Sequence, residues 1–157
     1  SIRERLEAWL LLCKKDDANI VKVLEEGLKS GAIRIPGTVQ NLNGFDSVHS
    51  VTSYLSARNA RHAKLFTWQG SINLKNAKYT RDDGPIDPQC DCPVCRRYSR
   101  AYLHHLFKAE EMLAMRLSVM HNLYFYNTLT RRIRDNLDAG TFGDFRAEYS
   151  QKLAEKI

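Results

Sequence analysis

The 157-residue sequence contains no long apolar run and no start typical of a signal peptide. These two absences argue against a membrane-spanning or secreted protein and predict a soluble, cytoplasmic one. Internal repeats and low-complexity tracts are also absent, so a repeat array is not expected. Cysteine is scarce, with four residues in the chain. Cytoplasmic thiols stay reduced, so a cluster of them indicates metal binding rather than a disulfide.

Acidic residues are missing from one long stretch. Residues 47–81 contain no Asp or Glu, and residues 96–134 contain only two acids against eight bases. The whole chain carries a formal charge of +6. The two basic stretches flank the cysteine-rich segment, so they predict one electropositive surface suited to phosphates. The alternative is an ordinary solvated face of lysine and arginine side chains. The six bases of the first stretch are Arg58, Arg61, Lys64, Lys75, Lys78 and Arg81.

Three of the cysteines lie within six residues and form, with a later histidine, the pattern C-x-C-x2-C-x25-H. The four residues are Cys90, Cys92, Cys95 and His121. Thiolate is a soft ligand and imidazole a borderline one, so this set predicts a tetrahedral zinc site. Four protein ligands leave no position open for substrate, which makes the zinc structural. Free buried thiols are the alternative, and core packing seldom places three so close.

The chain is about one domain long, and its periodicity predicts a mainly helical α+β fold. Ser118 is expected to cap a helix, which would put His121 near a helix start. Gly140 is expected to end that helix. Cys13 is expected to be a buried small hydrophobe. In chain order, the predicted elements are helices at 2–15 and 18–30, strands at 64–68 and 71–74 joined at Gln69-Gly70, and helices at 98–117, 119–138 and 144–156.

Several segments after residue 59 resemble the C-terminal part of the tRNA-guanine transglycosylases, enzymes that exchange a guanine in tRNA for a 7-deazaguanine. The resemblance implies a structural zinc on the same three cysteines and histidine, in agreement with the ligand argument. It covers about 100 residues of the chain. The matching segments are INLKNAKY at 72–79, PID at 85–87, CDCPVC at 90–95, YSRAYLHHL at 98–106 and HNL at 121–123.

Upstream the resemblance is partial. The segment GFDSV at 44–48 is similar to the family's Phe-Asp-Cys-Val, with Ser47 in place of cysteine. The resemblance implies that Asp46 is the nucleophile that attacks C1′ of the ribose. It also implies that Arg58 and Arg61 bind the tRNA, and Lys64 is expected beside them. Asp46 equally fits the start of a turn, and the connection from Asp46 to Arg58 is longer than the family pattern.

Family members are TIM barrels of about 250 residues or more, which cannot fit into this length. Their base pocket uses a glycine-rich loop and a second aspartate, and neither is found here. The expected organisation is a helical segment of unclear origin at 1–43, then a transglycosylase-like C-terminal region at 44–157. The second part would contain a zinc-binding subdomain at about 82–140. The chain is therefore expected to be a partial or rearranged transglycosylase, the C-terminal portion of a barrel.

Two functions remain open at this point. The first is base exchange in the tRNA anticodon, and the second is a non-catalytic zinc-stabilised module for RNA binding or subunit interaction. The expected partners are tRNA and either a second copy or a complementary catalytic chain. Such a protein partner is expected around Tyr98, Tyr102 and His105, because aromatic side chains are enriched at interfaces. His104 is expected at the surface with His105.

Overall fold

The computed structural model describes residues 56–157. The helices predicted at 2–15 and 18–30, the residue Cys13 and the candidate nucleophile Asp46 lie outside these residues. Residues 56–61 are helical and lead into the first strand. The named elements are β1 (Lys64–Thr67), β2 (Gly70–Asn73), the 3-10 helix η1 (Ala77–Tyr79), α4 (Pro93–Arg97), α5 (Arg100–Lys108), α6 (Met112–Asp138) and α7 (Phe142–Ala154).

The two strands form an antiparallel hairpin in which Leu65 lies opposite Ile72. Its turn is fixed by Thr67, whose hydroxyl donates to the carbonyl of Gly70 at 2.8 Å. Gly70 has φ +146°, and a Cβ there would lie 3.0 Å from the carbonyl oxygen of Glu155. A glycine is therefore required where the end of the chain passes the hairpin. The predicted strands at 64–68 and 71–74 are confirmed, with ends displaced by one residue.

Helix α6 is continuous over 27 residues, so the predicted helix boundary at residue 118 is wrong. The boundary between the two helices lies earlier in the chain, after α5, where Glu110 adopts φ 55°. Ser118 is fully buried inside α6 and caps nothing. No glycine or proline marks the real break, which is why the sequence pattern misplaced it. Gly140 has φ +71° and follows the end of α6, as predicted.

Successive residues of β1 face two different cores, as the alternation of side chains along a strand requires. Leu65 packs with Ile72 and the cysteine-rich segment. Phe66 and Trp68 pack instead with an aromatic cluster from α6 and α7. The Phe66 ring meets the Tyr126 ring edge to face, with centroids 5.1 Å apart. The hairpin therefore separates a metal-side core from an aromatic core.

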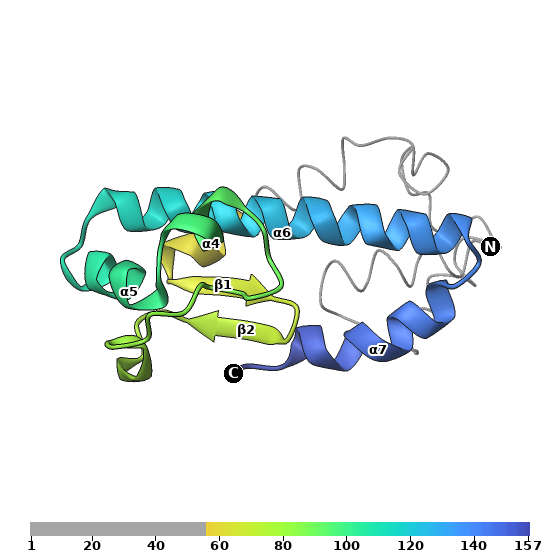
Figure 1. Cartoon of the computed structure of the whole chain (residues 1–157), viewed down its shortest axis with the longest axis horizontal. Helices are drawn as coiled ribbons and strands as arrows, with labels where there is room; N and C mark the ends of the chain where they lie inside the picture. Colours follow the sequence, from red (N-terminus) through yellow and green to blue (C-terminus); the bar gives the residue numbers. More distant parts are fainter. Residues whose placement is uncertain (1–55) are drawn as a thin grey trace, which may run out of the picture.

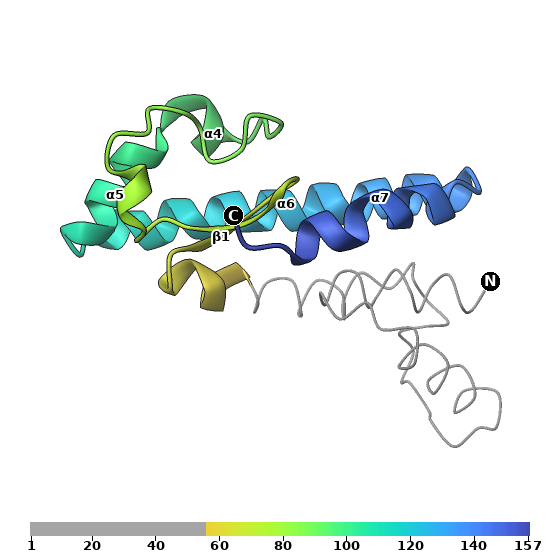
Figure 2. The same cartoon turned by 90° about the horizontal axis from the view of Figure 1, so that it is seen from below.

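Helix α6 joins the two cores. Figure 1 shows the hairpin beside the first half of α6 and α7 beside its second half. The view in Figure 2 places the helical segment 56–61 on the opposite side of the hairpin from α4. The described part is thus mainly helical with one small antiparallel sheet, as expected from the periodicity.

Candidate metal centre

The four residues of the C-x-C-x2-C-x25-H pattern come together in the fold. Their ligand atoms all lie within 4.8 Å of one another. Cys92, Cys95 and His121 are buried and Cys90 is half-buried. The three cysteines are free of disulfide bonds. These four residues, called the metal cluster below, form a group that could hold a metal ion.

A single turn of chain presents the three sulfur atoms. Cys92 is the N-cap residue of α4, and its Sγ accepts a hydrogen bond from the backbone N–H of Cys95 at 3.3 Å. Pro93 occupies the first helical position, where its missing N–H costs nothing. The short helix therefore sets Cys95 one turn beyond Cys92, so that both thiols face the same point.

Asp87 fixes the loop that carries the three cysteines (residues 88–95, called the metal loop below) to the hairpin. Its carboxylate is buried, with 1% of the residue exposed. One oxygen accepts from the backbone N–H of Trp68 at 2.8 Å and the other from the N–H of Gln89 at 2.8 Å. Sequence reasoning gave Asp87 no role, although the segment PID at 85–87 belongs to the resemblance. One buried and one partly buried hydrogen bond to its carboxylate make it a structural anchor of the loop.

His121 is the tenth residue of α6, so its expected place in a first helical turn is wrong. The helix begins earlier than the pattern indicated, and the small residue Ser118 lies one turn before the histidine. Nε2 of His121 lies 2.8 Å from the carbonyl oxygen of Phe66. A carbonyl only accepts, so Nε2 carries the proton and Nδ1 is left to face the sulfurs.

The spacing of the ligand atoms agrees with a tetrahedral ion. Nδ1 of His121 lies 3.4 Å from Sγ of Cys92, 3.4 Å from Sγ of Cys95 and 3.9 Å from Sγ of Cys90. Bond lengths typical of zinc, at a tetrahedral angle, place sulfur and nitrogen about 3.6 Å apart. Soft sulfur and one imidazole nitrogen at this spacing are the donor set that zinc prefers.

Protons compete with a metal for these groups. Hydrogen bonds from the Cys90 and Cys95 thiols lower the pKa of Cys92. Hydrogen bonds with Cys90 and Cys92, together with burial, raise the pKa of Cys95. Burial lowers the pKa of His121, but its hydrogen bonds to Cys90, Cys92 and Phe66 outweigh this and bring the pKa to about 9. A bound cation would displace these shared protons, so metal binding releases protons.

The candidate RNA-binding residues lie on and after the helical segment 56–61. Arg58 and Arg61 are exposed and are three residues apart on it, a spacing that places two side chains on one helical face. Lys64 begins β1 and is half-buried, with its Nζ 5.8 Å from the centroid of the Phe66 ring. The three bases thus lie within seven residues of the chain, two on the helical segment and one at the start of β1.

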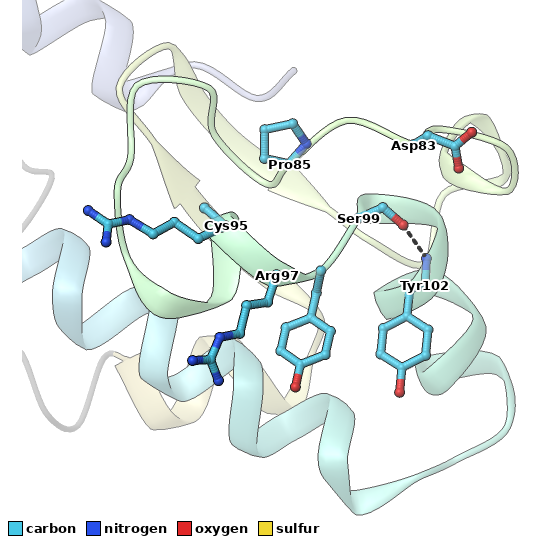
Figure 3. A pocket seen from close by; sticks show the side chains of 8 residues that line it. Asp83, Pro85, Cys95, Arg97, Ser99 and Tyr102 are labelled. Atoms are coloured by element: carbon cyan, nitrogen blue, oxygen red, sulfur yellow. Dashed lines mark hydrogen bonds between the residues drawn. The ribbon is translucent and has the colours of Figure 1, made fainter.

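A hollow of about 610 Å³ lies beside the metal loop (Figure 3). The rings of Tyr98 and Tyr102 stack at its edge, with centroids 5.4 Å apart and planes 13° apart. His105 is exposed, but the expectation that His104 is also at the surface is wrong. His104 is 4% exposed and its ring hydrogen-bonds the carbonyl of Leu74. A backbone partner makes this burial possible.

Among residues 56–157, no helix is both long enough and apolar enough to cross a membrane.

The chain is similar to known proteins over most of its length. A family model described as queuine tRNA-ribosyltransferase matches residues 40–155. The queuine tRNA-ribosyltransferase of Clostridium kluyveri is 53% identical over 140 residues, which cover 89% of this chain and 32% of that protein. The protein of the same name from Clostridium perfringens is 60% identical over 94 residues, covering 60% of this chain and 25% of the relative.

A third relative of that name, from Clostridium botulinum, is 58% identical over 98 residues, covering 62% of this chain and 25% of its own length. The chain thus spans about a third or less of the curated relatives that it matches. The family match covers well over half of the chain and includes the whole metal cluster. This chain belongs to the queuine tRNA-ribosyltransferase family.

Proposed function

We propose that this chain is the C-terminal, zinc-binding part of a tRNA-guanine transglycosylase, which exchanges guanine for a 7-deazaguanine in the tRNA anticodon. The observation that carries the proposal is the family match over residues 40–155, within which the metal cluster assembles. The name of the relatives, queuine tRNA-ribosyltransferase, supports the same activity.

The metal cluster would hold one zinc ion. Its four protein ligands satisfy a tetrahedral ion, so the zinc would cross-link the metal loop to α6 and leave no position for a substrate. When bound, the ion supplies folding energy rather than Lewis-acid chemistry. His121 holds its N–H on the Phe66 carbonyl and presents its other nitrogen, while Asp87 keeps the loop against the hairpin.

Arg58, Arg61 and Lys64 would bind the phosphates and anticodon bases of the tRNA. Two exposed guanidinium groups on one helical face support this, because each can donate paired hydrogen bonds to a phosphate. Base exchange also requires the target nucleotide to leave its stack, so firm backbone contacts beside it are physically expected. The partner would therefore be structured tRNA in the cytoplasm.

Asp46 would be the catalytic nucleophile. Its carboxylate oxygen would bond to C1′ of the ribose as the bond from C1′ to the guanine nitrogen breaks, and guanine would leave with that electron pair and take up a proton. The ring nitrogen of the incoming 7-deazaguanine would then bond to C1′ and lose its proton, as the bond from C1′ to the Asp46 oxygen breaks and the carboxylate is restored. The resemblance of the segment at 44–48 supports this assignment, and the residue lies outside those that the structure describes.

The remaining strands of a TIM barrel would come from outside this sequence. In this organisation, residues 44–157 form the transglycosylase-like region, and about 82–140 form its zinc-binding subdomain. A second copy, or a chain that carries the base pocket, would dock around Tyr98, Tyr102 and His105. The stacked rings of the half-buried Tyr98 and the exposed Tyr102 beside a hollow support that location.

The experiment is incorporation of labelled guanine into unmodified tRNA by the zinc-loaded protein, with Asp46→Asn as the comparison. Exchange that disappears in Asp46→Asn, together with loss of a covalent protein–RNA adduct, would establish the reaction and its nucleophile. If no exchange occurs and tRNA still binds with zinc present, the chain is either a fragment whose catalytic half lies elsewhere or a non-catalytic RNA-binding module.

A further inference from the structure

The backbone of Phe66 is held on both sides by two consecutive side chains of α6. Nε2 of His121 donates to the Phe66 carbonyl at 2.8 Å, and Oδ1 of Asn122 accepts from the Phe66 N–H at 3.2 Å. All three residues are buried, with 1% or less of each exposed. His121 and Asn122 of α6 therefore bind the carbonyl and the N–H of Phe66. His121 also belongs to the metal cluster.

The amide of Asn122 has two further partners. Its Nδ2 donates to the carbonyl of Lys64 at 3.1 Å and to the carbonyl of Ser56 at 3.4 Å. The amide thus accepts once and uses both of its N–H groups, and its orientation is fixed because one partner is an N–H and two are carbonyls. Asn122 contacts three places in the chain: the strand β1 twice and the helical segment 56–61 once.

Small side chains accompany this hydrogen-bonded contact. Ser118 lies one helical turn before Asn122 on α6, and it is fully buried, as are Ser56 and Ala60. Side chains of this size allow two backbones to approach closely, which a direct bond from a short amide to a neighbouring backbone requires. The segment 56–61 is therefore joined to α6 by a short, specific contact between Asn122 and the Ser56 backbone.

The far end of the same segment is tied to the hairpin. The backbone N–H of Leu74 donates to the carbonyl of Ala63 at 2.9 Å, just after the segment ends. The segment that carries Arg58 and Arg61 is held at Ser56 by Asn122 and at Ala63 by the residue after β2. Figure 2 shows this segment across the hairpin from α4. His121 belongs to the metal cluster, whereas Asn122 bonds to Ser56 of this segment.

We infer that Asn122 is a positioning residue that couples the metal-anchored helix α6 to Arg58 and Arg61. Its side chain fixes the segment 56–61 against the same strand residue that orients His121. The guanidinium groups are then held at a set place relative to the metal centre before RNA arrives, which lowers the ordering cost of binding. The RNA-binding half of this inference rests on the proposed function.

The test compares Asn122→Ala with His104→Ala in the zinc-loaded chain. His104 is a matched control, because it is also a buried polar side chain bonded to a backbone carbonyl, but its partners are Leu74 and Thr80. Amide hydrogen exchange is followed for peptides covering 56–66 and 90–95, and zinc content is measured in the same samples.

The expected result is one zinc per chain in both variants and exchange at least about tenfold faster at 56–66 in Asn122→Ala alone, because the substitution removes all three hydrogen bonds of the Asn122 amide. Unchanged exchange at 56–66 in Asn122→Ala overturns the inference. Equal acceleration in His104→Ala also overturns it, because the effect would then be a general loss of stability.

A second arm measures affinity for an anticodon stem-loop in wild type, the Arg58→Ala/Arg61→Ala variant, Asn122→Ala and the triple variant. If Asn122 acts through the two arginines, the triple variant binds as weakly as the Arg58→Ala/Arg61→Ala variant. Fully additive losses overturn the coupling. A wild-type chain that shows no arginine-dependent RNA binding overturns the proposed function instead, and the exchange comparison then decides the positioning role by itself.

Discussion

Nε2 of His121 donates to the backbone carbonyl of Phe66 at 2.8 Å, so a residue of α6 is oriented by a strand residue 55 positions earlier in the chain. The carbonyl fixes the tautomer and the ring plane, and Nδ1 is left toward the cysteines. The metal cluster is therefore completed by tertiary structure, and metal binding and hairpin docking should depend on each other.

Loss of the imidazole should remove most of the metal affinity. His121→Ala deletes one of four ligands and is expected to weaken zinc binding on the order of 100-fold. Cobalt titration checks this, because a bound cobalt ion with three thiolate ligands and one nitrogen gives strong visible absorption that the variant should lose. His105→Ala is the control, since His105 is exposed and outside the metal cluster.

Chelation of the wild-type chain should also lower its thermal stability and its helicity around residues 90–121. An unchanged melting temperature after complete metal removal, or an unchanged zinc affinity in His121→Ala, would contradict the assignment of this site.

Asp87→Ala should destabilise the protein and loosen the metal. The substitution leaves the buried N–H of Trp68 without its acceptor, which typically costs about 2 to 3 kcal/mol. It also frees the metal loop, so zinc affinity should fall about tenfold, as for other groups that support metal ligands. Urea unfolding and competition with a chelator measure the two effects.

Asp83→Ala is the matched control for Asp87→Ala, because Asp83 is an exposed aspartate a few residues earlier. Equal effects of the two substitutions would show that the buried hydrogen bonds of Asp87 contribute nothing specific.

Asp82→Asn should lower stability by about 1 kcal/mol at pH 7, through loss of its ion pair with Arg100 at 3.0 Å. Burial raises the pKa of Asp82, but hydrogen bonds from Arg100 and the Gly84 N–H hold this pKa below 3.8. A folded-state pKa below the unfolded value gives stability that is present above the unfolded pKa and lost as pH falls through the folded one.

The difference between wild type and Asp82→Asn should therefore stay constant from pH 8 to pH 5.5, a range in which the carboxylate is ionised in both states. Urea unfolding of the zinc-saturated proteins at the two pH values checks it. If the difference vanished by pH 5.5, the pKa of Asp82 in the folded protein would be higher than an ion pair with Arg100 allows.

Arg58→Ala and Arg61→Ala should each weaken tRNA binding, and each should reduce the slope of log affinity against log salt by about 1. The reason is the loss of one released counterion for each phosphate contact removed. Lys152→Ala is the control, because Lys152 lies on α7 and pairs with Glu148 at 3.3 Å. Salt slopes that match wild type in both arginine variants would exclude these residues from the RNA interface.

Local patterns were sufficient to predict the hairpin and the final helix. Two strand-like segments joined at Gln69-Gly70 predicted the hairpin, and four-residue spacing predicted the helix now seen at Phe142–Ala154. The metal cluster could be predicted as well, since ligand chemistry and spacing suffice to indicate it. The family resemblance is confirmed by the match over residues 40–155.

The break between α5 and α6 could not be predicted. It depends on a left-handed Glu110, a conformation that glutamate seldom adopts, while Ser118 gave a false capping signal inside the helix. The burial of His104 and the role of Asn122 depend on backbone partners from distant segments. No periodic pattern of residue types predicts such contacts. Asn122 does, however, belong to the segment HNL at 121–123, which is part of the family resemblance.

The alternation of side chains along β1 makes the metal centre sensitive to errors in strand pairing. A slip of one residue would turn every side chain of the strand to the opposite face, sending Phe66 away from Tyr126 and Leu65 into the aromatic core. The same slip would remove the carbonyl that His121 uses and the N–H that Asn122 uses. A misregistered hairpin would then leave the histidine without its orienting acceptor, so only the correctly paired chain presents a complete ligand set. Metal binding should therefore stabilise the correctly paired hairpin over the misregistered one.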